Sequence, residues 1–135
     1  MKNLIYLLSI IMVIACSSKP KIDFPYTFID EKTENGTNTM ELYTVPATLN
    51  IDTLKMFCLD KKGTISSGTF HYLVFFDAKE NAVFPTNPIT AFYGLDEEPQ
   101  KHIKAYYEYN RVNGFSELKV YESNSWESKA EVIKL

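Results

Sequence analysis

The segment that most constrains this fold is residues 69–76, where apolar side chains occupy both alternating sets of positions. In a strand, successive side chains point to opposite faces of the sheet. One set is Phe70, Tyr72, Val74 and Phe76, and the other is His71, Leu73 and Phe75. Aromatic and β-branched residues favour strands, and a strand that is apolar on both faces is buried within its sheet. The sequence therefore predicts a central strand here.

Two alternating segments precede this strand. Residues 22–29 carry apolar side chains at every second position, but Pro25 cannot donate a ladder hydrogen bond, which indicates an edge strand or an arm. Asn35-Gly36 is a turn signal, and the alternation resumes over residues 39–45. We expect the two segments to pair as a hairpin.

The apolar spacing changes to a helical period after Asn50. Leu54 and Phe57 recur on one face of a helix, with charged residues elsewhere on its surface. Asn50 is a favourable N-cap, and Gly63 follows two lysines, which is typical of a helix C-terminus. We predict a helix over residues 51–62.

The central strand is followed by a polar stretch at residues 77–81, which is typical of a hairpin loop. The apolar residues 82–84 then predict a return strand. Two prolines interrupt this strand before it resumes over residues 89–93.

Residues 96–114 have two interpretations. As a helix, the segment has acidic residues in its first turn, Arg111 in its last turn and Gly114 as its stop, and Tyr109 would point outward. As strands, Asn113-Gly114 is a two-residue hairpin turn. We favour the helix, because it accounts for the charges at both ends.

Residues 115–122 predict a strand, residues 123–128 a loop that carries Trp126, and residues 132–135 a short final strand. The resulting order predicts an α+β fold in which an antiparallel sheet has two helices on one face. This is the order of a ferredoxin-like, split βαβ sandwich. Because that fold hosts many unrelated functions, it says little about activity.

The start of the chain is an apolar leader. Lys2 is followed by residues 4–15, which are apolar except for Ser9 and carry no charge. This run is too short to span a bilayer and has the layout of a secretory signal peptide.

The end of this leader, Val13-Ile14-Ala15-Cys16, resembles the lipobox of bacterial lipoproteins. The resemblance implies cleavage before Cys16 and a diacylglycerol on its sulfur, with acyl chains that anchor the protein firmly. We expect a signal peptide at residues 1–15, a lipidated cysteine and tether at 16–21, and one globular domain at 22–135. Since no aspartate follows Cys16, the resemblance favours the periplasmic face of the outer membrane.

If Cys16 carries lipid, Cys58 has no partner for an intramolecular disulfide. Cys58 lies between apolar residues on the predicted helix face. We therefore expect a buried, unreactive thiol rather than a nucleophile.

Composition and motifs exclude several function classes. Fourteen basic residues stand against seventeen acidic ones, a net charge of −3, so the basic field used for nucleic-acid binding is missing. The chain has no glycine-rich phosphate loop, serine-hydrolase elbow or zinc-binding spacing. We expect no cofactor, no metal site and no nucleic-acid partner.

Two functional hypotheses remain. We favour a small, lipid-anchored, non-enzymatic binding or accessory domain of the cell envelope, of which an immunity-type inhibitor is one version. Exposed aromatic residues such as Tyr109 and Trp126 would contact a protein partner. The alternative is an envelope enzyme that uses His71 with Asp77 or Glu80 in acid–base chemistry. Convergent polar groups in a pocket would favour the enzyme, and an exposed aromatic patch would favour the binding domain.

Overall fold

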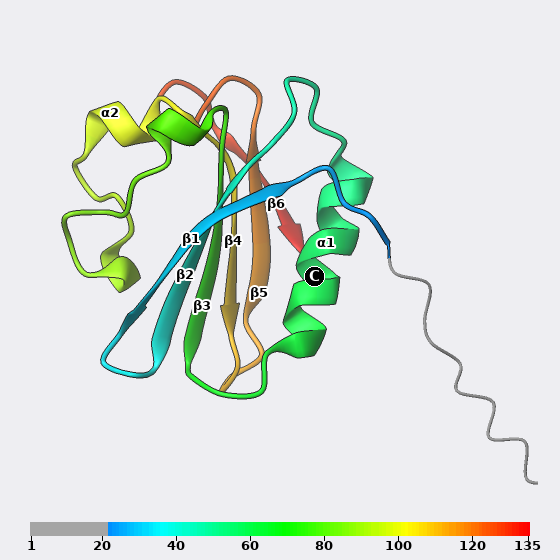
Figure 1. Cartoon of the computed structure of the whole chain (residues 1–135), viewed down its shortest axis with the longest axis vertical. Coiled ribbons are helices and arrows are strands. Elements are labelled where there is room, and N and C mark those ends of the chain that lie inside the picture. The colour runs from blue at the N-terminus through cyan, green and yellow to red at the C-terminus, as the bar shows by residue number, and fades with distance from the viewer. Residues whose placement is uncertain (1–21) are drawn as a thin grey trace, which may run out of the picture.

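A computed structural model describes residues 22–135 as one mixed α+β unit built on a six-stranded sheet (Figure 1). The strands lie in chain order, and each pairs only with its neighbours in sequence. All pairs are antiparallel except β2 and β3, which are parallel and are joined through the long helix α1. The strands are β1 (Thr27–Glu34), β2 (Asn38–Thr44), β3 (Phe70–Phe76), β4 (Ile103–Asn110), β5 (Ser116–Tyr121) and β6 (Ala130–Lys134).

Strand β3 is central, as its two apolar faces predicted, because it lies between β2 and β4. β1 and β2 form the expected hairpin around Asn35-Gly36, but its first strand covers residues 27–34 rather than the predicted 22–29. Its turn residues Asn35 and Gly36 both have positive φ, 55° and 66°, as a tight hairpin turn requires. β1 begins two residues after Pro25, at Thr27, which keeps the proline outside the ladder.

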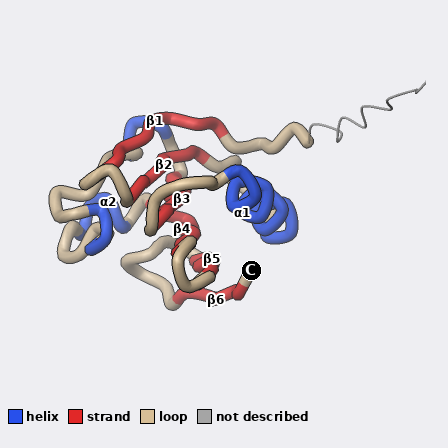
Figure 2. The backbone as a smooth tube through the Cα atoms, turned by 90° about the horizontal axis from the view of Figure 1, so that it is seen from below, coloured by secondary structure: helices blue, strands red, loops and turns tan. Residues whose placement is uncertain are grey.

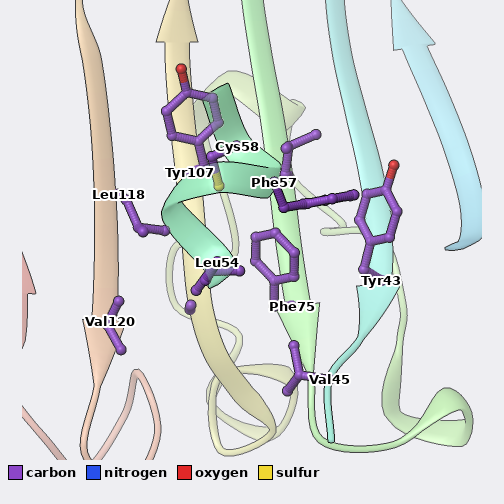
Figure 3. Close-up of a cluster of buried hydrophobic side chains, with 11 residues drawn as sticks. Tyr43, Val45, Leu54, Phe57, Cys58, Phe75, Tyr107, Leu118 and Val120 are labelled. Atoms are coloured by element: carbon purple, nitrogen blue, oxygen red, sulfur yellow. The ribbon is translucent and has the colours of Figure 1, made fainter. Parts of the chain in front are cut away.

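Helix α1 (Ile51–Thr64) covers one face of the sheet (Figure 2). Asn50 caps it as predicted, since its side-chain oxygen accepts a hydrogen bond from the Thr53 N–H at 2.9 Å. The helix continues past Gly63 to Thr64, so the predicted stop at Gly63 is wrong. Figure 3 shows the core that its inner face forms with β2 to β5. The buried members of this core are Tyr43, Val45, Leu54, Phe57, Cys58, Leu73, Phe75, Ala105, Tyr107, Leu118 and Val120.

The opposite face of the sheet is covered by residues 77–102, which contain only short helical turns (Figure 2). These are η1 (Lys79–Asn81), η2 (Ile89–Ala91) and α2 (Glu97–Gln100). The strands predicted at 82–84 and 89–93 are therefore wrong. Ile89 and Tyr93 instead pack against the sheet and form a second core with it. The other buried members of this core are Met40, Leu42, Tyr72, Val74, Phe76 and Ile103.

The helix predicted over residues 96–114 is also wrong. α2 ends at Gln100, β4 begins at Ile103, and β4 forms an antiparallel hairpin with β5. The alternative interpretation is thus the correct one, although the connection is longer than Asn113-Gly114 alone. In β4, Tyr107 faces the core on the α1 side and Tyr106 faces the other side.

These differences correct the fold class in its detail. The α+β class holds, but the sheet has one long helix on one face and an irregular segment on the other, rather than two helices on one face. A ferredoxin-like sandwich is wrong as well, because its split βαβ units interleave their strands, whereas these strands follow chain order. Within residues 22–135, no helix is long and apolar enough to cross a membrane.

Candidate functional site

A cleft of about 570 Å³ opens at the end of the sheet where β2, β3 and β5 finish and β4 and β6 begin. It lies beyond the N-terminus of α1, between the β2–α1 loop and the edge formed by β5 and β6. Apolar atoms of Val45, Leu49, Ile51 and Val120 line its interior. Charged side chains line it as well: Asp77, Lys104, Glu122, Lys129 and Glu131. Apolar surface and charged side chains thus line the same cleft, as in many binding sites.

Asp77 lines the cleft and is the first residue of the long segment 77–102. Its carboxylate accepts a hydrogen bond from the Asn81 amide at 2.9 Å and lies 3.0 Å from Nδ1 of His102. The backbone N–H of Asp77 also donates to the carbonyl of His102, at 3.0 Å. The two ends of the covering segment are therefore held together where they meet the cleft.

The environment of Asp77 favours its charged form. Partial burial raises the pKa of this carboxyl, but the hydrogen bonds from Asn81 and His102 outweigh that effect, and the charge of Lys104 adds to them. The net result is a pKa below the ordinary value of 3.8.

This shift predicts a pH-dependent contribution to stability. A carboxyl whose pKa is lower in the folded than in the unfolded state stabilises the fold above the unfolded value, and the effect disappears as pH falls through the folded pKa. Asp77→Asn should therefore destabilise the domain at pH 6, and its difference from wild type should shrink as pH falls below about 3.8. Urea denaturation at pH 6 and pH 3 measures this. A difference that stays constant over that range would contradict the role given to the Asp77 charge.

Lys104 connects the cleft to the loop between β5 and β6. Its ammonium group donates to the carbonyl of Ser123 at 2.5 Å and lies close enough to Asp77 to lower the pKa of that carboxyl. The loop of residues 122–129 thus starts and ends at cleft-lining residues, Glu122 and Lys129.

Trp126 projects from this loop and is 48% exposed. The loop is held by the buried side chain of Asn124, whose oxygen accepts from the N–H groups of Trp126 and Glu127 at 3.0 and 2.9 Å. Ser125 ties the loop to the body, since its N–H donates to the carbonyl of Ile103 at 3.0 Å. The tryptophan is therefore held on a backbone with little freedom to rearrange.

Tyr109 does not have the position that the helical interpretation gave it. It lies in β4, half-buried on the α1 face of the sheet, with the Lys62 ammonium 5.2 Å from its ring centre. Its ring also lies 6.2 Å from that of His71. Tyr109 thus completes the packing between α1 and the sheet rather than protruding from the surface.

The residues of the enzyme hypothesis do not meet. His71 lies near the start of β3, and Nε2 of its ring is 2.8 Å from the carbonyl oxygen of Ser67. Asp77 follows the other end of the same strand, six residues and about 20 Å away, and Glu80 lies beyond it in η1. The histidine near Asp77 is His102, a pairing that spans 25 positions and that no local motif signals.

Two predicted site residues remain, Cys58 and Cys16. Cys58 is free and buried, as expected. Cys16 and the lipobox lie outside the described residues. Within residues 22–135, no cluster of His, Cys, Asp or Glu side chains could hold a metal ion.

Comparisons with protein-family models, curated proteins and solved structures give no match to this chain.

Proposed function

We propose that this protein is a small, lipid-anchored binding domain of the bacterial envelope that contacts a protein partner through Trp126 and the adjoining cleft. The observation that carries the proposal is the rigid presentation of a half-exposed tryptophan on a loop whose two ends line the cleft. The lipid would be attached at Cys16, and the domain would act without catalysis at the periplasmic face of the outer membrane.

The energetics of association support this use of Trp126. A few large aromatic side chains supply most of the binding energy of typical protein interfaces. Ordering a flexible loop on binding costs free energy, and the hydrogen bonds of Asn124 have already ordered this one. Lys104 and Lys129 beside Glu122 and Glu131 offer both signs of charge for selecting a partner.

An immunity-type inhibitor is one concrete version of this function. Such a protein would be compact and held at the membrane, and it would occupy a toxin by direct contact. The net charge of −3 is compatible with a basic target.

The test is quantitative capture from detergent-solubilised membranes, with the intact lipoprotein as bait. Trp126→Ala should reduce recovery of the captured partner about thirtyfold, the effect of losing about 2 kcal/mol at an interface hot spot. Val112→Ala is the matched control, because Val112 is also exposed but lies in the β4–β5 connection at the other end of the sheet. Equal recovery with both variants would refute the assigned contact.

The anchor is tested in the same preparation. Intact-mass measurement should show an acylated N-terminal Cys16, and Cys16→Ala should leave the membrane fraction or stay unprocessed. An unmodified thiol at Cys16 would refute the anchor and leave the Trp126 contact to be judged by the capture experiment.

A further inference from the structure

The chain enters the described domain on the side that carries α1. Figures 1 and 2 show the segment before β1 passing beside this helix. Phe24 and Tyr26 fix the segment there, since the ring centre of each lies 5.1 Å from that of Phe57 in α1. Whatever is attached upstream of Ile22 is therefore connected to the α1 side of the molecule.

The outer surface of α1 exposes apolar side chains. Met56 and Leu59 are 49% and 47% exposed, and their i, i+3 spacing puts them side by side on the helix. Ile22, where the segment enters, is exposed as well. We call Met56 and Leu59 the α1 stripe. Asp52 and Asp60 are also exposed on this side, and Lys55 pairs with Asp52 at 3.2 Å.

The length of the tether limits which face can approach the bilayer. Residues 16–21 span at most about 20 Å when fully extended. A domain of the size of residues 22–135 has a radius of gyration of about 13 Å, which corresponds to a globule about 34 Å across. A lipid on Cys16 would therefore hold the α1 side within reach of the membrane, while the covering segment 77–102 lies on the far side of the sheet.

On this basis, and resting on the proposed lipid at Cys16, we propose that the α1 stripe lies against the headgroup region of the membrane. Met56 and Leu59 insert at the boundary of the acyl chains, and the stem of Lys55 can extend its ammonium group towards lipid phosphates. The contact buries few apolar side chains, and the exposed Asp52 and Asp60 are repelled by anionic lipids. The contact therefore depends on the tether to hold the helix at the membrane. The face covered by residues 77–102 then points away from the bilayer.

Site-specific fluorescence quenching tests this orientation. Met56→Cys and Leu95→Cys are each labelled with an environment-sensitive fluorophore in the full, acylated protein, reconstituted in phosphatidylethanolamine–phosphatidylglycerol vesicles that contain a headgroup spin-labelled lipid. Leu95 is the matched control, because it is 95% exposed and belongs to the segment on the opposite face. Native Cys58 is buried and stays unlabelled. Thermal melts confirm that both surface variants are folded.

We expect quenching at position 56 to exceed that at position 95 by at least about threefold, since interfacial side chains reach about 5–10 Å into the boundary region. Equal quenching at the two positions, or stronger quenching at 95, overturns the proposed orientation even if the protein floats with the vesicles. A protein that is not acylated and does not float overturns the anchor, and the orientation with it. The two failures are distinguished by vesicle flotation alone.

Discussion

Replacing Tyr107 with alanine should lower the free energy of unfolding by about 4 kcal/mol, as expected for truncating a fully buried aromatic residue. Tyr107 lies in the core between α1 and the sheet, and its hydroxyl is 2.7 Å from the hydroxyl of Ser116. The truncation leaves both a cavity and a buried Ser116 hydroxyl without this partner. Urea denaturation of a Cys16→Ser variant, which cannot carry the proposed lipid, measures the effect.

Two control variants separate the contributions to this loss. Tyr107→Phe keeps the ring and should cost only about 1 kcal/mol, the usual value for one hydrogen bond. Tyr109→Ala removes a half-buried ring at the margin of the same core and should cost about 1–2 kcal/mol. A loss below about 1 kcal/mol for Tyr107→Ala, or a larger loss for Tyr109→Ala, would contradict the register of β4.

The second large effect concerns the reactivity of Cys58. Its side chain is fully buried, and burial raises the pKa of the thiol well above its ordinary value, so the reactive thiolate is scarce. Alkylation in native buffer should therefore require opening of the structure. We expect it to be about 1,000-fold slower, or more, than for an exposed cysteine.

The matched comparison is Leu59→Cys in a Cys58→Ser background, which moves the thiol by one residue to the exposed face of α1. Mass spectrometry of iodoacetamide adducts over time gives both rates. Raising the pH from 7 to 9 should speed labelling at position 59 while position 58 remains slow. Comparable rates at the two positions would mean that α1 is rotated relative to the core described here.

The parts of the fold that were predicted correctly are those with local signals. The N-cap and the apolar face of helix α1 can each be recognised from residues a few positions apart. The β1–β2 turn is marked by Asn35-Gly36. β3 was predicted from its own composition, because apolar side chains occupy both sets of alternating positions. The helix cap and the hairpin turn depend on residues close in sequence, and β3 was recognised from its own residues although its partners β2 and β4 lie far away in the chain.

β4 was missed because two signals conflicted. Acidic residues before it and Arg111 after it suit a helix, whereas its paired aromatic residues suit a strand. The register shift opposite Phe75 and Phe76 also places Ile103 and Ala105 on opposite faces, although they are two residues apart, and this breaks the alternation by which a strand is recognised. Pairing with β3 and β5 then decides the conformation, and that pairing is not a local property.

The cleft could not be predicted for the same reason. Asp77, Lys104 and the two ends of the β5–β6 loop, Glu122 and Lys129, meet only after the sheet has formed. Trp126 was correctly placed in a loop, but the role of Asn124 in fixing that loop depends on its burial. Reasoning from spacing thus finds the exposed aromatic residue but not the charged groups that line the cleft.

The chain-order arrangement of the sheet also determines how the domain can fold. No strand has to wait for a partner beyond the next strand in the chain, although the two longest closures, across residues 45–69 and 77–102, each span about 25 residues. A chain that emerged N-terminus first from a translocation pore could add β2 to β1, then β3 after α1, and so on to β6. A chain with this strand order can assemble progressively from its N-terminus, with few long-lived unpaired strands exposed to aggregation.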